Sequence, residues 1–462
     1  MAACAIPASA WIVQACSPTA PQLFAPDVSL PAFDSSPPAI AFDSGTEPVR
    51  VAVASAAGPI AGATVVFHDT NGKVIGTTTT DSAGHAEKIL TAGAGVTILY
   101  GSAQTVLQAV TYLGVEPGDL LAAFDATVTP NNPQVTITDV PGSPPPQTTG
   151  YGALVGNCNT FFPSPPSSMY VSPDCLNPAG RFPLIVEALD QNSAQLGYAY
   201  RKDIALDFDA GANVSLADAS WSSAQVNWSV LLSGTQPQYP PLVDVSEVAS
   251  YVSHTTSQDP STDPDGGLST SPFPLHVGFP DFVQTEIQSS SFGTVGTTFS
   301  VVTNRSAAPT KDATLTMDLT KLPPAINTMT FDYGTAQPTV TFAPDSPITN
   351  ASGTFVVFSW SNDADAGTTA NRWTIVAPPS MTTITAPELP SSAVDWTTTA
   401  LAYYDTPTVT VMSFDALKSY ADFRRAAAAL PPPDYFTIGL RVTPLLPFDG
   451  TLALSSVGPY IE

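Results

Sequence analysis

Two aspartate-rich segments are the strongest candidates for metal chemistry in this sequence. Asp259, Asp263 and Asp265 lie in DPSTDPDGG, and Asp363 and Asp365 lie in NDADAG. Alternate carboxylates on glycine-containing backbone supply the oxygen ligands that Ca²⁺ prefers. Neither segment completes an EF-hand loop, because the distal glutamate is missing, and the alternative is a pair of solvated aspartate-rich turns. Calcium is therefore the only cofactor that the sequence suggests.

Aromatic side chains offer a second kind of chemistry, the stacking of flat rings on sugars. The candidates are Trp360, Trp373, Trp396, Tyr403 and Tyr404. On the exposed face of a sheet these rings would form a carbohydrate-binding surface. Trp360 and Trp373, however, lie in alternating apolar runs, where packing in a core is the usual fate of a tryptophan. The sequence leaves both interpretations open.

The four cysteines fall into two pairs with different expected roles. Cys158 and Cys175 flank a Pro/Ser-rich loop, and we predict that they form an intradomain disulfide, worth about 3 kcal/mol in the chain-entropy model. The alternative is two free buried thiols. A zinc site is not expected, because no further Cys or His lies at zinc-ligand spacing. The other pair, Cys4 and Cys16, lies near the N-terminus.

The N-terminal segment has features of an export signal. Residues 5–15 are mostly apolar, too short to span a bilayer and close in length to the core of a signal peptide. Val13-Gln14-Ala15-Cys16 then resembles a bacterial lipobox, which implies that Cys16 is lipidated. No Lys or Arg precedes the apolar stretch, and cleavage after Ala10 would instead give a secreted protein. We therefore expect an outer-membrane or cell-surface location with a lipid anchor, or secretion.

Known catalytic signatures are absent from the sequence. It contains no G-x-S-x-G, S-x-x-K, H-E-x-x-H or C-x-x-C motif and no phosphate-binding glycine loop. The four histidines are scattered, and we expect His68 and His85 at the surface. The prediction is a protein without enzyme activity. The alternative is an extracellular hydrolase of polysaccharide or peptide that uses carboxylates of the C-terminal region, which no local spacing would reveal.

Composition favours an all-β protein that does not bind nucleic acid. The chain has 14 Lys+Arg against 39 Asp+Glu, a net charge of -25, 47 prolines and 43% hydrophobic residues. The abundance of Pro, Thr, Ser and Val favours strands and turns, while the apolar fraction is sufficient for packed cores. A nucleic-acid partner is not expected, because phosphate binding needs a basic surface.

Residues 59–100 show the strand pattern most clearly. Short apolar runs at 63–67, 74–79, 86–90 and 96–100 alternate with turn residues at 69–72, 81–84 and 92–95. Alternation over a few residues between Asp, Asn and Gly turns is typical of antiparallel hairpins. This segment predicts a small β-sandwich and contains no residue set that looks catalytic.

The same segment resembles the carboxypeptidase regulatory-like (transthyretin-like) and bacterial Ig-like domains of surface proteins. Gly58-Pro59-Ile60-Ala61-Gly62-Ala63-Thr64-Val65 is similar to the opening G-x-P-V-x-G-A-x-V, and Thr80-Asp81-Ser82-Ala83-Gly84-His85-Ala86 is similar to the T-D-x-x-G-x-A turn. The resemblance covers roughly residues 47–138. It implies a β-sandwich and an exported protein, but no particular activity, because such sandwiches serve many unrelated roles.

The chain divides into five expected regions. They are a leader at 1–16, a Pro/Ser-rich tether at 17–46, a first β-sandwich at 47–139, a second β-sandwich with the disulfide at 150–230, and a larger β-domain at 231–462. The strand at 135–138 is expected to complete the first sandwich. Helices are expected at 413–430, with Ser413 as N-cap, and as a short element at 243–254.

These features predict tandem Ig-like or transthyretin-like β-sandwiches in a non-catalytic bacterial surface protein. Its role would be binding, adhesion or structural display. A surface glycan or a protein ligand is the expected partner, and the membrane would be contacted only through the N-terminal lipid anchor. A carbohydrate-binding protein is a further alternative.

Overall fold

The computed structural model describes residues 47–458 with several gaps. The gaps are 56–57, 102–106, 126–133, 157, 172–174, 176–180, 207–210, 235–240, 251, 263–266, 294–295, 334–336, 362–370, 397–402, 405, 431–444 and 448. Within the described residues the regular secondary structure is almost entirely β-strand, as predicted.

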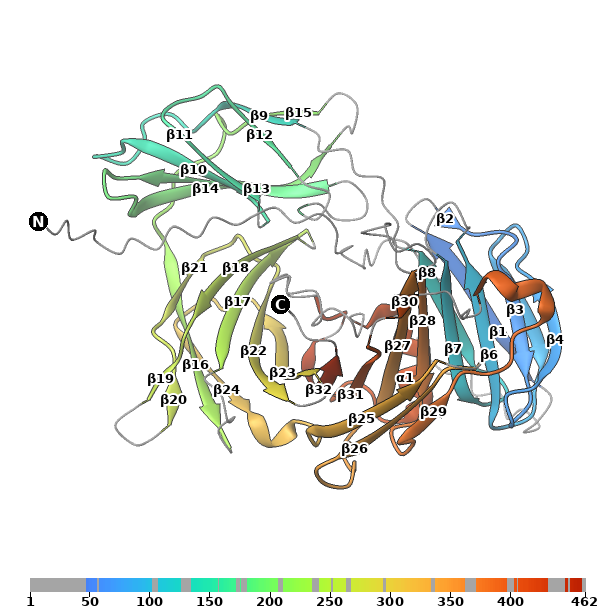
Figure 1. Cartoon of the computed structure of the whole chain (residues 1–462). Coiled ribbons are helices and arrows are strands. Elements are labelled where there is room, and N and C mark those ends of the chain that lie inside the picture. The colour runs from blue at the N-terminus through green and yellow to red at the C-terminus, as the bar shows by residue number, and fades with distance from the viewer. Residues whose placement is uncertain are drawn as a thin grey trace, which may run out of the picture.

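One curved sheet runs through the whole body of the protein (Figure 1) and is called the main sheet below. Its thirteen strands are β3 (Thr64–His68), β4 (Val74–Thr79), β6 (Ala94–Tyr100), β7 (Gln108–Val115), β17 (Leu242–Ala249), β18 (Val252–Gln258), β22 (Phe282–Gly293), β23 (Gly296–Ala307), β27 (Gly353–Ser361), β28 (Asn371–Ala377), β30 (Tyr403–Tyr404), β31 (Thr408–Phe414) and β32 (Gly450–Gly458). Their order is β18-β17-β22-β23-β32-β31-β27-β28-β7-β6-β3-β4, and β30 pairs with β27.

A parallel strand pair joins the first expected domain to the C-terminal one. β7 lies beside β28, with Gln108 opposite Arg372 and Tyr112 opposite Val376. The regions 47–139 and 231–462 are therefore not separate sandwiches in series. They share a single hydrogen-bonded sheet, a pairing between segments far apart in the sequence that no local pattern predicts.

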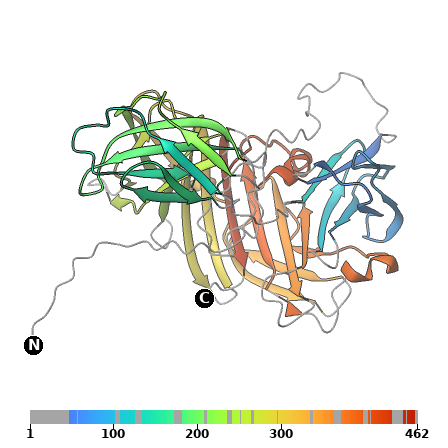
Figure 2. The same ribbon diagram turned by 90° about the horizontal axis from the view of Figure 1, so that it is seen from above.

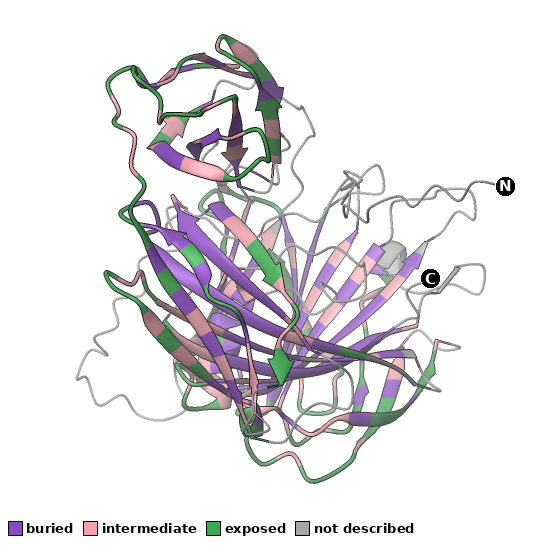
Figure 3. Cartoon of the chain, turned by 90° about the vertical axis from the view of Figure 1, so that its left-hand side faces the viewer, coloured by how far each residue is buried: buried purple, intermediate pink, exposed green. Residues whose placement is uncertain are grey.

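Three smaller sheets pack on the main sheet and complete the sandwiches. The first-unit sheet contains β1 (Pro48–Ser55), β2 (Gly58–Pro59), β5 (His85–Ile89) and β8 (Leu120–Asp125); a five-stranded sheet contains β16 (Gln225–Ser233), β19 (Ser261–Thr262), β20 (Leu268–Ser269), β21 (Phe273–His276) and β24 (Ala313–Asp318); a three-stranded sheet contains β25 (Ile326–Asp332), β26 (Thr339–Pro344) and β29 (Thr383–Thr385). Successive residues of β3 show how the faces divide. Val65 and Phe67 enter the core under the first-unit sheet, and Val66 enters the core under the three-stranded sheet. Many main-sheet strands are buried at consecutive residues, which are purple in Figure 3, so buried side chains lie on both of their faces.

A separate sandwich is inserted in the chain between β8 and β16. We call strands β1–β8 the first unit and all described residues outside the first unit and the inserted sandwich the body. The inserted sandwich lies at the opposite end of the body from the first unit (Figure 2). This inserted sandwich packs β9 (Gln134–Asp139), β12 (Ser167–Tyr170) and β15 (Ala212–Ser215) against β10 (Gly150–Val155), β11 (Cys158–Phe162), β13 (Arg181–Leu189) and β14 (Gln195–Ala205). β9 pairs with β12 and β15, so placing residues 135–138 in the first domain was wrong. The predicted disulfide between Cys158 and Cys175 is confirmed.

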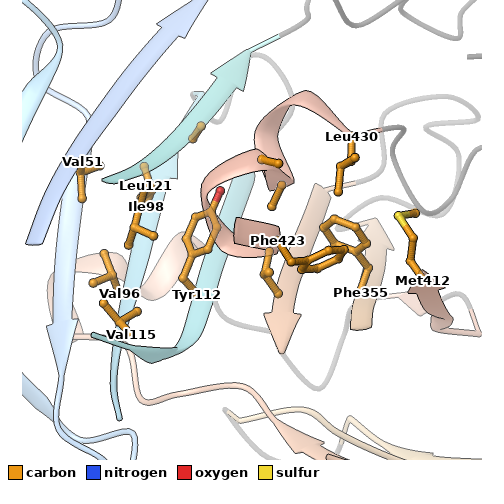
Figure 4. Close-up of a cluster of buried hydrophobic side chains, with 14 of the residues drawn as sticks. Val51, Val96, Ile98, Tyr112, Val115, Leu121, Phe355, Met412, Phe423 and Leu430 are labelled. Atoms are coloured by element: carbon orange, nitrogen blue, oxygen red, sulfur yellow. The ribbon is translucent and has the colours of Figure 1, made fainter. Parts of the chain in front are cut away.

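The helix near the C-terminus is shorter than predicted. Residues 408–414 form β31, and α1 spans Tyr420–Ala426, followed by the 3₁₀ turn η4 (Ala427–Ala429). Ser419, not Ser413, is the N-cap and accepts a hydrogen bond from the backbone N–H of Asp422. Phe423 packs beside Phe355 in the core that Tyr112 and Leu121 also enter, so α1 fills the corner between the first unit and the main sheet (Figure 4).

The short helix predicted at 243–254 is a hairpin of β17 and β18. Every residue of β17 from Val243 to Ala249 is buried, so the polar residues Asp244, Ser246 and Glu247 interrupt the apolar pattern without facing solvent. Because polar and apolar residues are mixed in this buried strand, its sequence lacks the alternation of apolar and polar residues that identifies a strand. Two further 3₁₀ elements, η2 (Leu319–Lys321) and η3 (Ser391–Trp396), complete the structure. Among the described helices, none is long and apolar enough to cross a membrane.

Candidate functional site

Two of the three tryptophans predicted for carbohydrate binding are core residues. Trp360 and Trp373 are each 0% exposed, under the three-stranded sheet, so their assignment to an exposed aromatic face was wrong. The indole N–H of Trp373 donates to Thr111 Oγ1 at 2.8 Å. Trp396 lies in η3, and Tyr403 and Tyr404 form β30 beside β27, but their side chains lie outside the described part of the structure.

The aspartates predicted to bind calcium are mostly outside the described residues. Asp259 is exposed after β18, whereas Asp263, Asp265, Asp363 and Asp365 fall in the gaps. Cys16 also lies outside, in the segment 1–46. Within the described ranges no group of three or more His, Cys, Asp or Glu side chains could hold a metal ion. Calcium binding and lipidation therefore stay predictions.

His68, expected at the surface, is fully buried at the end of β3, while His85 is exposed. The Nε2 of His68 lies 2.9 Å from Thr97 Oγ1. Thr97 Oγ1 in turn lies 2.8 Å from Thr111 Oγ1, which accepts the hydrogen bond from Trp373. Burial lowers the pKa of His68 to about 4, although the charge of Asp69 opposes the shift. The ring is therefore neutral near pH 7. This polar row crosses the joint between β7 and β28.

A second buried histidine, His276, lies between the inserted sandwich and the body. Its Nδ1 is 2.7 Å from Glu247 Oε2, and its backbone N–H donates to Glu247 Oε1 at 2.6 Å. Glu187 Oε1 of the inserted sandwich is 3.6 Å from Nε2. The side-chain amide of Gln195 lies 2.8 Å from Nε2, and the ring of Tyr198 packs edge-on at 4.4 Å. We call these five residues the His276 cluster.

The charge of His276 is set by its two carboxylate neighbours. Burial alone would lower its pKa, but the hydrogen bonds to and the charges of Glu187 and Glu247 raise it to about 9. The nearby His254, whose ring centroid is 6.5 Å away, has a lowered pKa because of burial. The two glutamates, one from each part of the protein, therefore favour the protonated ring of His276.

Apolar packing and one ion pair complete this junction. Ile185 and Tyr198 of the inserted sandwich form a small core with Ala249 and Phe279 of the body. At its edge Lys202 Nζ lies 2.8 Å from Asp281 Oδ1. The outer face of β13 and β14 is therefore the attachment surface.

The same outer face continues past the junction to an exposed aromatic ring. Phe161 on β11, Gly152 on β10 and Glu187 on β13 are opposite one another in register. Phe161 Cε1 lies 3.5 Å, and Glu187 Oε2 lies 3.4 Å, from the point where a side-chain carbon on Gly152 would stand. Phe161 is 71% exposed, and the Glu187 side chain 19%. An accessible ring and a carboxylate oxygen thus meet above Gly152.

A buried carboxyl pair lies on the main sheet. Asp244 of β17 is opposite Glu286 of β22, and they are 5% and 3% exposed. Burial and the charge of Asp244 raise the pKa of Glu286 to about 8, against the effect of a 3.2 Å hydrogen bond from Thr303. Further along the same face of β22 is a 340 Å³ pocket lined by Phe282 and Arg305. With its raised pKa, Glu286 holds its proton near neutral pH, opposite Asp244 on the neighbouring strand.

Sequence reasoning did not identify these groups, because each is assembled from distant strands. Glu187, Glu247 and His276 come from three strands, β13, β17 and β21. The available signal was weak: Glu247 lies in a run of residues that are otherwise mostly apolar, where a charged side chain is seldom buried without a partner.

Comparison with known proteins identifies no relative. No protein-family profile and no curated protein sequence matches this chain. Among solved structures, the chain is similar to the Bacillus anthracis TIE protein at 9% identity and a TM-score of 0.16, over 59% of this chain and 50% of that one. It is also similar to a tetra-tandem repeat in the extending region of a large adhesion protein, at 12% identity and a TM-score of 0.12, over 79% of this chain and 95% of that one. Half of the first protein's length is thus spanned, and neither similarity carries a functional argument.

Proposed function

We propose that this chain is an exported, non-catalytic binding or adhesion protein of a bacterial surface. The main sheet acts as a rigid frame, and the inserted sandwich carries the contact surface. One observation supports this assignment most directly. Phe161 and Tyr170, each 71% exposed, are the most exposed large apolar side chains among the described residues, and they lie on the outer faces of the two sheets of the inserted sandwich. Exposed aromatic rings are frequent anchors of binding interfaces.

The proposed surface location rests on the N-terminal sequence. The lipobox-like Val13-Gln14-Ala15-Cys16 and the Pro/Ser-rich segment 17–46 would tether the described body to a membrane. The disulfide is consistent with an oxidising compartment. Mass analysis of native protein should find a lipidated Cys16. An intact, unmodified Cys16 at or inside the mature N-terminus would remove the anchor from the proposal.

Binding is tested with the purified chain and intact bacterial or host cells. The double variant Phe161→Ala/Tyr170→Ala should lose most cell association, because both exposed rings are removed while the cores stay intact. Ile89→Ala, which truncates a 61% exposed residue of the first unit, is the matched control. Equal binding by the double variant and the control would contradict the assignment of the contact surface.

The buried carboxyl pair supports a second candidate, an extracellular hydrolase. Asp244 and Glu286 would act as base and acid. Wild-type protein is incubated with polysaccharide and peptide libraries, and products are detected by mass spectrometry. Hydrolysis that is abolished by Glu286→Gln would favour this candidate, whereas hydrolysis unaffected by both Glu286→Gln and Asp244→Asn would exclude this pair as the site.

A further inference from the structure

The outer face of the inserted sandwich brings one aromatic ring and one carboxylate to the same place. Gly152 has no side chain, so the space above it is shared by Phe161 Cε1 and Glu187 Oε2. Leu189 Cδ1 lies 3.5 Å from the same point and adds an apolar wall. A side-chain carbon at 152 would stand in ordinary contact with both groups and fill the space between them. The sequence of strand β10 therefore keeps the two groups within reach of a single ligand group.

The position of the Glu187 carboxylate is fixed from behind. Its Oε1 faces His276, which Glu247 holds from the opposite side. Oε2 of Glu187 lies beside Gly152, and the Glu187 side chain is 19% exposed. A carboxylate held in place by such contacts loses little freedom when it binds a ligand.

We propose that Phe161, Gly152 and Glu187 form a binding site for an arginine or lysine side chain of a partner protein. A guanidinium or ammonium group has only donors, which match a carboxylate oxygen and the face of an aromatic ring. The aliphatic stem of such a side chain would lie on Leu189. The net charge of -25 would draw a basic partner surface toward this face.

A sugar fits this site less well. Sugar hydroxyls both donate and accept hydrogen bonds, so a sugar site combines donors and acceptors around the ring on which the sugar stacks. Phe161 and Leu189 have no polar atom, and ionised Glu187 is an acceptor only. The inference rests on the proposed function in one respect, since it takes the inserted sandwich as the contact surface.

Calorimetric titration of the full chain tests the proposal directly. The probe is a short peptide in which arginine alternates with glycine, and the control peptide carries neutral citrulline in place of arginine. We expect binding of the arginine peptide only. Phe161→Ala should weaken it about tenfold, the size expected for a partly desolvated cation–aromatic contact. Because Phe161 is 71% exposed, this variant should fold normally.

A matched pair of charge variants separates the site from general attraction to an acidic protein. Glu187→Gln and Glu87→Gln remove the same charge, but Glu87 lies on the first unit with a 66% exposed side chain. Only Glu187→Gln should abolish binding. Equal weakening by both variants, or no effect of Phe161→Ala, would overturn the proposal.

The remaining outcomes distinguish the site from the proposed function. Peptide binding that depends on Phe161, together with no cell association, would support this site and contradict the surface role. Cell association through Phe161 and Tyr170 with no affinity for the arginine peptide would support the surface role and contradict this site. Binding of a neutral oligosaccharide in place of the peptide, lost in Phe161→Ala, would replace the basic partner by a glycan.

Discussion

The first unit and the inserted sandwich are attached to the body in different ways. The first unit is joined by main-chain hydrogen bonds of β7 and β28 and by a shared core that α1 completes. The buried ion pair between Arg424 of α1 and Asp119 of the first unit, 2.7 Å long, strengthens this joint. In the described residues, the inserted sandwich is joined through side chains: the His276 cluster, the small core around Ile185 and Phe279, and the Lys202–Asp281 ion pair. The first joint should therefore unfold with the body, whereas the second can open by itself.

The largest expected effect comes from the core of the first joint. Phe423 is 0% exposed and packs 5.1 Å from the ring of Phe355. Phe423→Ala should lower the free energy of unfolding by about 3–5 kcal/mol, because it leaves a cavity where the first unit, α1 and the main sheet meet. Urea unfolding followed by hydrogen exchange would show first unit and body melting together at lower urea. A first unit that stays folded at the wild-type urea concentration while the body unfolds earlier would contradict the claim that the two unfold together.

A rise in pH should weaken the second joint. The folded pKa of His276 is raised from 6.5 to about 9, so its stabilisation is complete below pH 6.5 and is lost as pH rises through 9. The shift corresponds to about 3 kcal/mol. Limited proteolysis and small-angle scattering at increasing pH would detect opening of the inserted sandwich.

The pH dependence that Glu286 adds to the stability of the body must be distinguished from that of His276. Its folded pKa is raised from 4.5 to about 8, so the body also loses stability as pH rises over that interval. Loss above pH 8 that persists in His276→Gln would show that the junction does not depend on the imidazolium.

Loss of the disulfide should act on the inserted sandwich alone. Cys158→Ser with Cys175→Ser removes a link worth about 3 kcal/mol in the chain-entropy model; Cys175 lies in the core of that sandwich and Cys158 packs against it. Calorimetry should show one transition moving to lower temperature while the other stays. A shift of both transitions would mean that the two parts unfold cooperatively.

The smallest effect is expected at the polar row across the first joint. Thr111→Val leaves the buried indole N–H of Trp373 without its acceptor and should cost about 1–2 kcal/mol. Thr341→Val, which removes an exposed threonine contact with Thr383, is the control and should change stability little. Equal effects of the two changes in chemical denaturation would contradict a role for the row.

Local patterns predicted local structure well. The hairpin of β3 and β4 follows from the apolar alternation around Asp69–Gly72, and the hairpin of β13 and β14 follows from the turn at Asp190. The disulfide likewise needed only two cysteines in one loop-rich segment. In each case the partner lies within a few tens of residues, so the sequence contains both sides of the contact.

Long-range pairing was beyond the sequence. Nothing near Gln108 indicates Arg372 as its neighbour, and nothing in β9 favours the inserted sandwich over the first unit. Strands buried on both faces, such as β17, lose the alternation that identifies them. The residues of the His276 cluster were visible only as isolated charges for the same reason, because their meaning depends on strands that meet in the fold.

The position of β32 within the main sheet has a consequence for biosynthesis. This strand, made after every other strand of the sheet, pairs with β23 on one side and β31 on the other. Until residues 450–458 emerge, the sheet is divided, and the backbone N–H and C=O groups on the β32-facing edges of β23 and β31 have no partner strand. The inserted sandwich, whose strands lie between 134 and 215, can fold long before that. A chain arrested ahead of β32 would thus present one finished sandwich and two exposed strand edges, the state in which assistance against aggregation matters most.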